Sequence, residues 1–273
     1  MTAREGKTAL VTGSTDGVGR VVAKRLARDG MRVLVHGRDR GRGEGLVAEI
    51  KAAGGSAEFL AADLSALAEV RRLADAVRKT TSRLDLLINN AGIGSASPKG
   101  ARETSADGYE LRFAVNYLAG FLLTDQLLPL IKNSTPARIV NVSSLGQQAI
   151  DFTDVMLTRG YSGSRAYCQS KLAQILFTID LAAELKVTGV TVNTLHPATY
   201  MNTTMVRRAG VTPTSSVEQG ADAILHLATG ADLEGRSGLF FNGQKEARAD
   251  PQAYDAQARQ RLKSLSLELA HLS

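Results

Sequence analysis

The stretch TALVTGSTDGVGR, residues 8 to 20, decides the fold of this chain. A short apolar run ends at Thr12, and Gly13, Gly17 and Gly19 follow in the spacing G-x-x-x-G-x-G. Glycine allows a sharp backbone turn, and it lets a pyrophosphate approach the amide-rich N-terminus of the next helix. At the first strand-to-helix turn of an alternating chain, these glycines predict a dinucleotide site, although their spacing departs from the standard G-x-G-x-x-G.

Outward from this turn, short apolar runs alternate with longer segments of helical period, as is typical of a parallel sheet with helices on both faces. We predict strands near residues 8–12, 32–36, 57–61, 84–89, 137–143, 189–195 and 238–241. The best-defined helices are predicted at 18–28, 66–79, 109–131, 165–185 and 217–228. Residues 1–273 are therefore predicted to form one α/β domain with a doubly wound, Rossmann-type, seven-stranded parallel sheet.

The composition excludes several classes of protein. With 44% apolar and 22% charged residues, 273 residues can bury a sizeable core. Cys168 is the only cysteine and the four histidines lack metal-ligand spacing, so we expect no disulfide framework and no metal site. The net charge is +6, but the arginines are scattered and aromatic residues are few, so we expect no nucleic-acid partner.

The sequence also predicts a cytoplasmic protein without a membrane partner. The N-terminal residues contain no apolar run of signal-peptide length. The most apolar stretches, 118–131 and 172–185, are short and interrupted by polar residues, which argues against a bilayer span.

Two segments, 146–164 and 198–216, show neither helical nor strand periodicity. Each follows the end of a predicted strand on the side where ligands bind in such sheets, so both are candidates for mobile loops that cover a substrate. Ordinary surface connections would have the same pattern.

Within the predicted helix at 165–185, Tyr167 and Lys171 are four residues apart. Positions i and i+4 lie on one helix face, so both side chains can point at the same spot. A half-buried tyrosine beside a solvated lysine gives the same spacing, and the spacing alone favours that simpler interpretation.

Further motifs decide between the functional and the structural interpretation of Tyr167 and Lys171. In order along the chain stand TGSTDGVG, Asp63 in AADLS, NNAG at 89–92, Asn116 in AVNYLAG, NVSS ending at Ser144, and Tyr167-x-x-x-Lys171. This ordered set resembles the short-chain dehydrogenase/reductase family. The 23-residue step from Ser144 to Tyr167 and the string AYCQSKLAQILF are similar to its retinol-dehydrogenase-like and protochlorophyllide-reductase-like branch.

The resemblance implies roles for the catalytic residues Asn116, Ser144, Tyr167 and Lys171. Tyr167 would exchange a proton with the substrate oxygen as hydride moves, and Lys171 would lower the tyrosine pKa and bind the nicotinamide ribose. Ser144, rather than Ser143, would hold the substrate oxygen. Asn116 would hold a water in a proton relay, or alternatively satisfy a backbone kink.

The resemblance also implies a cofactor site. Asp63 would contact the adenine, or alternatively cap the following helix. Pro197 is followed by Ala198 where the family usually has Pro-Gly, and the threonine that contacts the carboxamide could be Thr199, Thr203 or Thr204. The predicted cofactor-binding residues are Gly13, Ser14, Thr15, Gly17, Val18, Gly19, Arg38, Asp63, Leu64, Asn90, Ala91, Gly92, Tyr167, Lys171, Pro197 and Thr199. Cys168, which points away from Tyr167, is interpreted as a packing residue.

The end of the second strand predicts the choice of cofactor. An NAD-selective site commonly has an acidic residue there, whereas this chain has Gly37 followed by Arg38. An arginine can form charge-assisted hydrogen bonds with a 2′-phosphate, so we expect NADP(H) to be preferred and NAD(H) to be possible. A register error of two residues would instead make Asp39 the ribose ligand.

These features together predict an NADP(H)-dependent oxidoreductase acting on a small-molecule carbonyl or secondary alcohol. A catalytically idle dinucleotide-binding sensor or scaffold is one alternative, and a nucleotide-sugar epimerase or dehydratase is another. We expect a homodimer or homotetramer, because the helices at 109–131 and 165–185 match those through which relatives associate. The C-terminal SLSLELAHLS could instead pack across one of those faces.

Overall fold

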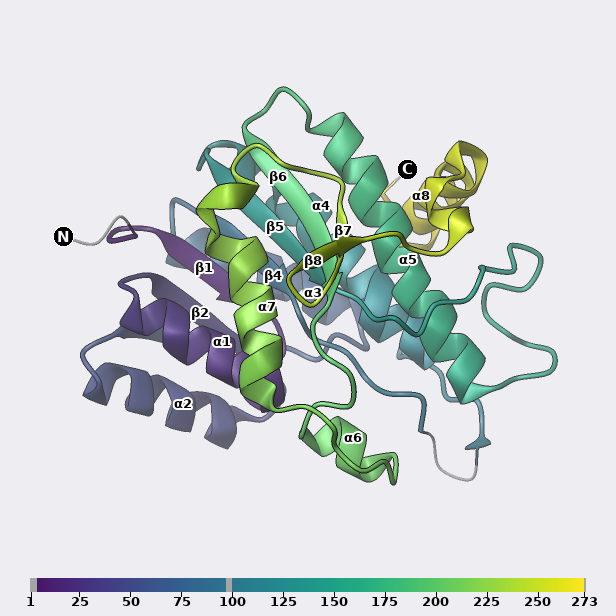
Figure 1. Cartoon of the computed structure of the whole chain (residues 1–273), viewed down its shortest axis with the longest axis horizontal. Helices are drawn as coiled ribbons and strands as arrows, with labels where there is room; N and C mark the ends of the chain where they lie inside the picture. Colours follow the sequence, from purple (N-terminus) through teal and green to yellow (C-terminus); the bar gives the residue numbers. More distant parts are fainter. Residues whose placement is uncertain (1–3, 97–99, 273) are drawn as a thin grey trace.

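The computed structural model describes residues 4–96 and 100–272. One twisted sheet runs through the middle of the molecule (Figure 1), with the strand order β3-β2-β1-β4-β5-β6-β7-β8. The strands are β1 (Thr8–Val11), β2 (Arg32–Gly37), β3 (Ser56–Ala61), β4 (Leu86–Asn89), β5 (Ala137–Val142), β6 (Val190–His196), β7 (Phe240–Asn242) and β8 (Lys245–Ala247). The reversal of order beside β1 confirms the predicted doubly wound α/β fold.

The sheet has eight strands instead of the predicted seven. The first seven are parallel, and β8 pairs antiparallel with β7 through a two-residue turn that begins at Gly243, where φ is 61°. The three residues of β8, KEA, are polar or short and show no apolar alternation. Hydrophobic pattern alone therefore could not reveal this edge strand.

Helices cover both faces of the sheet. On one face lie α1 (Gly17–Arg28), α2 (Arg40–Ala52) and α7 (Val217–Thr229), and on the other lie α3 (Leu67–Thr80), α4 (Ala119–Lys132) and α5 (Gly163–Glu184). Helix α2 is not among the helices predicted as best defined, because its three glycines reduce helix propensity. Gly43 is nevertheless required there, since a Cβ at this position would lie 2.1 Å from the Phe59 ring.

The helix predicted at 109–131 begins with a π-helical turn, η2 (Phe113–Leu118), and continues as α4. Within the described residues, Phe113–Lys132 is the one helix that is long and apolar enough to cross a membrane, and 61% of its most apolar window is buried inside the protein. Phe113, Tyr117 and Leu122 on this helix belong to the core cluster, so its apolar character is explained by packing.

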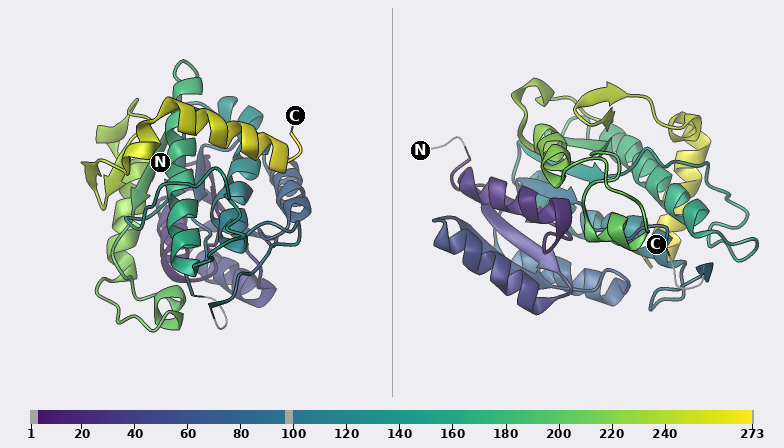
Figure 2. Two further views of the ribbon diagram at one scale, coloured as in Figure 1. Left: turned by 90° about the vertical axis from the view of Figure 1, so that its right-hand side faces the viewer. Right: turned by 60° about the horizontal axis from the view of Figure 1, so that its bottom comes forward.

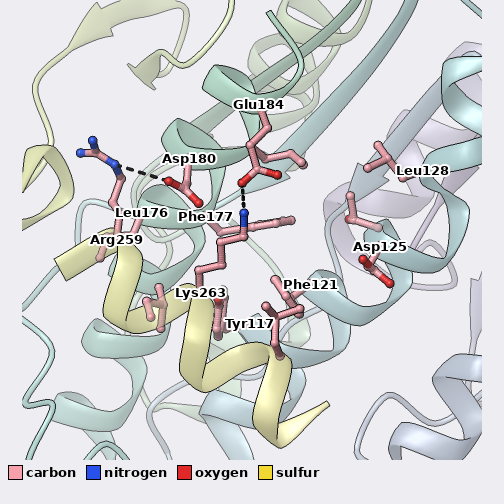
Figure 3. A pocket seen from close by; sticks show the side chains of 14 residues that line it. Tyr117, Phe121, Asp125, Leu128, Leu176, Phe177, Asp180, Glu184, Arg259 and Lys263 are labelled. Carbon is pink, nitrogen blue, oxygen red and sulfur yellow. Dashed lines mark hydrogen bonds and ion pairs between the residues drawn. The ribbon is translucent and has the colours of Figure 1, made fainter. Parts of the chain in front are cut away.

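Helix α8 (Ala256–Leu269) lies across α5 and the start of the α4 helix, as the left view of Figure 2 shows. The hydroxyls of Tyr117 and Ser266 are 2.6 Å apart, and Lys263 forms an ion pair with Glu184. A small pocket remains between the three helices, with Phe121 and Phe177 in its wall (Figure 3). The C-terminal segment therefore packs across one of the helix faces that we expected to mediate association.

The two irregular segments differ in structure. Most of 146–164 has no regular secondary structure, and α5 begins at Gly163. The 198–216 segment contains the short helix α6 (Thr204–Arg208) and a bridge between Met201 and Ser215. Other short elements in the described part of the chain include the 3-10 turns η3 (Ala231–Leu233) and η4 (Pro251–Tyr254).

Candidate active site

The glycine-rich turn after β1 is too crowded for side chains. A Cβ at Gly13 would lie 2.8 Å from the Ala91 Cα, and a Cβ at Gly19 would lie 2.5 Å from both the Gly13 carbonyl oxygen and the Asn90 side chain. Gly17, at φ 53°, begins α1, and the carboxylate of the N-cap Asp16 accepts its N–H at 2.7 Å. These glycines therefore bring bare backbone to the N-terminus of a helix, which is the geometry that a pyrophosphate needs.

His36 on β2 supports this turn, and the sequence interpretation missed it. Its Nδ1 accepts the Gly13 N–H at 3.1 Å, while its backbone N–H donates to the Ser14 Oγ at 2.9 Å. Burial lowers the pKa of His36 to about 4, so the ring is neutral at neutral pH and can accept this hydrogen bond. The available signal was a histidine directly after the apolar run VLV at 33–35.

The NNAG segment after β4 is tied to the same turn. Asn90 Nδ2 donates to the carbonyl oxygens of Thr12 and Gly13 at 2.8 and 3.2 Å. The Thr12 hydroxyl in turn accepts the N–H groups of Asn90 and Ala91, each at 3.0 Å. Thr12, which was not among the predicted site residues, thus fixes the spacing between two walls of the candidate cofactor site.

The end of β2 has the register predicted from the sequence. The strand ends at Gly37, and a side chain there would collide with Thr15, whose atoms lie 2.5 Å from an ideal Cβ. Asp39 is the N-cap of α2, where its carboxylate accepts the Arg42 N–H at 3.0 Å. The structure therefore gives Asp39 a helix-capping contact.

Arg38 and Asp63 face each other across the ends of β2 and β3. Their charged groups are 3.7 Å apart, and both side chains are largely exposed. Asp63 also accepts the Ser65 N–H at 2.9 Å, whereas the N-cap of α3 is Ala66. The alternative role of Asp63 as the cap of the following helix is therefore wrong, because Asp63 instead closes the turn before it.

Ser144 and Tyr167 meet beside Gly146. A Cβ at Gly146 would lie 3.4 Å from both the Ser144 Oγ and the Tyr167 ring. The Gly146 N–H donates to the Ser144 Oγ at 3.0 Å, which leaves the hydroxyl hydrogen of Ser144 free to be donated elsewhere. Ser143 points away, since its hydroxyl donates to the Lys171 carbonyl oxygen at 2.6 Å. The structure thus brings Ser144, the serine chosen from the sequence, to the tyrosine.

Lys171 lies beneath Tyr167 and is 5% exposed. Its Nζ donates to the Val142 carbonyl oxygen at 2.9 Å and to the Gln174 side chain at 3.0 Å. Burial lowers the pKa of Lys171 to about 7, and it raises the pKa of Tyr167 more than a hydrogen bond with Ser144 lowers it. The net pKa of Tyr167 is therefore raised, because desolvation dominates, and the lowering that we expect from Lys171 stays a prediction.

Asn116 lies in the π-helical turn η2 and is 2% exposed. Its side chain accepts the Ile93 N–H at 2.7 Å and donates to the Ile93 carbonyl oxygen at 3.1 Å and to the Ser170 Oγ at 2.9 Å. These contacts support the structural role that we gave as an alternative. A Cβ at Gly92 would lie 3.2 Å from the Asn116 Oδ1 and 3.5 Å from the Lys171 Nζ, so these residues also converge at the proposed relay position.

The remaining predicted cofactor residues fall in two groups. Ser14, Val18, Leu64 and Pro197 are buried around the glycine-rich turn and the ends of β3 and β6. Thr199 is exposed, and its hydroxyl lies 3.1 Å from His196 Nε2. Thr203 caps α6 and lies 3.2 Å from an ideal Cβ at Gly17, so among the three candidate threonines it is the one in contact with the glycine-rich turn.

Cys168 is half-buried, and burial raises the pKa of its thiol. Because the thiolate is the nucleophilic form, these surroundings fit a packing residue better than a nucleophile. Within the described residues, no group of three or more His, Cys, Asp or Glu side chains is arranged to hold a metal ion.

Comparison with known proteins assigns this geometry to a family. Residues 7–213 match the short chain dehydrogenase family. Human retinol dehydrogenase 13 is 37% identical, over 98% of this chain and 85% of the human protein. Bovine retinol dehydrogenase 12 is 36% identical, over 97% of this chain and 86% of the bovine protein.

Solved structures agree. An uncharacterised protein from Mycobacterium paratuberculosis superimposes with a TM-score of 0.83, at 31% identity over 99% of this chain and 96% of that one. The Pseudomonas aeruginosa RhlG/NADP active-site complex gives a TM-score of 0.72, at 28% identity, over 87% of this chain and 94% of that one. The chain therefore belongs to the short-chain dehydrogenase/reductase family, in the branch that resembles the retinol dehydrogenases.

Proposed function

We propose that this protein is an NADP(H)-dependent oxidoreductase that transfers hydride between the nicotinamide and a carbonyl compound or its alcohol. The observation that carries the proposal is the convergence of Ser144 and Tyr167 at Gly146, with Lys171 buried beneath the tyrosine. A hydroxyl donor, a phenol and a buried ammonium side by side are suited to exchanging a proton with a substrate oxygen.

The residues present fit a dinucleotide. The crowded glycines at 13 and 19 leave a backbone cradle at the start of α1, a helix of 12 residues whose N-terminus favours an anion. Arg38 is 68% exposed at the end of β2, where a 2′-phosphate would be recognised. The N-cap role of Asp39 and the NADP named in the RhlG complex support the preference for NADP(H), with NAD(H) as the weaker cofactor.

Each side chain has a defined part in the proposed reaction. The bound cofactor would supply or accept the hydride. Ser144 would donate its hydroxyl hydrogen to the substrate oxygen, and Tyr167 would give that oxygen a proton during reduction or remove one during oxidation. Lys171 has three N–H donors, of which two reach Val142 and Gln174, so one is left for a ribose hydroxyl.

We also propose that the substrate is apolar. Three large apolar or aromatic side chains, Leu145, Tyr200 and Met205, are 39 to 53% exposed, and all three lie in or beside the segments that follow β5 and β6. Exposed apolar groups gathered at a candidate site indicate an apolar ligand. The relatives named retinol dehydrogenases suggest a long, apolar primary alcohol of the retinol kind.

A substrate panel tests the function. Purified protein is given NADPH or NADP⁺ with short and long aldehydes and alcohols, and nicotinamide absorbance is followed. We expect turnover with long apolar substrates, and a loss of at least about a hundredfold in Tyr167→Phe with cofactor affinity preserved. Ser144→Ala should reduce turnover, whereas the matched variant Ser143→Ala should not. Cofactor binding without turnover of any substrate would instead support the idle sensor or scaffold.

We further propose a cytoplasmic location, on the strength of the sequence alone. Any homodimer or homotetramer would have to use a surface other than the part of α4 and α5 on which α8 lies.

A further inference from the structure

Among the described residues, Arg112 is the largest side chain that is almost completely buried, at 1% exposure, and the proposed reaction does not use it. It stands just before the π-helical turn η2, outside the glycine-rich and catalytic motifs. Its Nε donates to the Gly94 carbonyl oxygen at 3.2 Å, and one Nη donates to the Ala96 carbonyl oxygen at 2.8 Å. The guanidinium therefore holds the segment that directly follows the NNAG motif.

A buried carboxylate joins this arginine to the other side of the site. Glu110, also 1% exposed, lies 3.5 Å from Arg112 and accepts the Phe113 N–H at 2.8 Å. The Glu110 carboxylate also accepts a hydrogen bond at 3.2 Å from the Tyr161 hydroxyl, at the end of the 146–164 segment. The 36% exposed Glu103 provides a second carboxylate 3.3 Å from Arg112.

Two further contacts reinforce the connection between the segments. Arg102 Nε donates to the Met156 carbonyl oxygen at 2.8 Å, and the Glu110 N–H points to the Met156 sulfur at 3.4 Å. Leu157, which directly follows Met156 in the sequence, has a backbone φ of 49° and is 1% exposed. A non-glycine residue keeps such a backbone conformation only where surrounding contacts impose it, so the 146–164 segment is firmly fixed at this point.

Both segments border the candidate substrate site. Ile93, directly before Gly94, is bound on both sides by Asn116. A Cβ at Gly94 would lie 3.1 Å from the Met205 side chain, which is one of the exposed apolar groups near the site. The 146–164 segment begins two residues after Ser144. Any change in the distance between the segments would therefore change the space beside Tyr167.

Burying a charged pair costs desolvation energy, and apolar residues of the same volume often stabilise a protein as well or better. The Arg112–Glu110 pair instead fixes the orientation of the groups bound to it, because planar guanidinium and carboxylate groups form hydrogen bonds only in certain directions. Stability alone therefore gives no reason for two buried charges here.

We propose that Arg112 is a positioning residue which, through Glu110 and Tyr161, locks residues 93–96 and 146–164 together as one rigid wall and so sets the width of the substrate pocket. The substrate is the apolar one of the proposed function, and the inference rests on that function. The wall selects for long apolar substrates. A wall held at a fixed position adds more binding free energy to a ligand that contacts it along the ligand's whole length than to a short ligand.

Tyr161→Phe tests the proposal without removing a buried charge, which Arg112→Ala would do at the risk of unfolding. The variant loses one hydroxyl that donates to a carboxylate. Tyr109→Phe is the matched control. Tyr109 precedes Glu110 in the sequence, but its hydroxyl donates to the Leu269 carbonyl oxygen at 3.0 Å and does not bridge the two segments.

The first readout is hydrogen exchange at the amides of Ile93 and Leu111, which donate to Asn116 and to the Glu103 carbonyl oxygen. We expect both amides to exchange on the order of tenfold faster in Tyr161→Phe and to be unchanged in Tyr109→Phe. Faster exchange confined to residues next to 161 would show that the two segments are not coupled, and would overturn the proposal.

The second readout separates positioning from general damage. With NADPH in excess, KM for a long-chain aldehyde should rise several-fold in Tyr161→Phe, while kcat and the KM for a short aldehyde stay at wild-type values. Equal effects on both aldehydes would also overturn the proposal. If the wild-type protein turns over no aldehyde, the proposed function has failed, and the exchange at Ile93 alone decides whether the wall exists.

Discussion

The Nζ of Lys171 lies 5.8 Å from the centre of the Tyr167 ring, and its hydrogen bonds go to Val142 and Gln174 instead of to the phenol. We therefore expect the lysine to act on the tyrosine through its charge. Because burial lowers the pKa of Lys171 to about 7, that charge is itself sensitive to pH near neutrality. The proton affinities of the two groups are consequently linked.

This linkage predicts a shifted pH profile for Lys171→Met. We expect the ribose of the bound cofactor to accept a hydrogen bond from Lys171 and so to favour its charged form. A charged Lys171 stabilises the phenolate, so removing it should raise the pKa of Tyr167 further above its ordinary value. Alcohol oxidation needs Tyr167 as a base, and its half-maximal rate should therefore move to higher pH. The pH dependence of kcat/KM measures this shift. A profile identical to that of the wild type would show that Lys171 has no electrostatic effect on Tyr167.

Arg38→Ala should weaken the preference for NADP(H). We propose that Arg38 binds the 2′-phosphate, and the loss of one charged hydrogen bond is worth about 2 kcal/mol, or roughly thirtyfold in kcat/KM for NADPH relative to NADH. Arg40→Ala is the control, because Arg40 is similarly exposed but pairs with Glu44 on α2. Gly37→Asp is a poorer test, since the new side chain would collide with Thr15. Equal effects of the two alanine variants, or a wild-type preference for NADH, would refute the assignment.

The two irregular segments should differ in mobility. The hydrogen bonds of 198–216 stay within the segment or reach its chain neighbours His196 and Gln219, as far as the described residues show. In contrast, Ile150 exchanges hydrogen bonds with Gln252, and Tyr161 reaches Glu110. We had expected both segments to cover the substrate as mobile loops. We now predict that cofactor and substrate together slow hydrogen exchange mainly in 198–216. A larger change in 146–164 would contradict this revision.

His36 should make stability depend on pH. Its pKa is about 4 in the folded protein and about 6.5 when unfolded, so the unfolded state binds the proton more readily between these values. Stability should be unaffected above pH 6.5 and should fall as pH drops towards 4, by up to about 3 kcal/mol. Urea unfolding at pH 7.5 and pH 5 measures the fall, which should be smaller in His36→Asn. The same fall in that variant would assign it to other groups.

The predictable features were those that local sequence determines. The strand and helix periods, the glycine-rich turn, and the i, i+4 placement of Tyr167 and Lys171 all follow from backbone geometry, and the structure confirms the fold. The roles of the site residues remain predictions.

The features that the sequence could not predict depend on contacts between distant segments. His36 supports Gly13 across 23 residues, and Tyr161 reaches Glu110 across 51. No periodicity marks such pairs, because each residue has an ordinary local context. The raised pKa of Tyr167 was missed for a related reason, since desolvation depends on the whole surrounding structure.

The position of α8 has a consequence for the order in which the protein folds during synthesis. The ribosome makes residues 256–269 after every strand of the sheet, at about 5–20 residues per second. Until they emerge, Tyr117, Phe121 and Phe177, which pack against one another beneath α8, lack that cover. The nascent chain thus has a brief interval in which an aromatic face is open to chaperones and to other nascent chains, and the arrival of one amphipathic helix ends it.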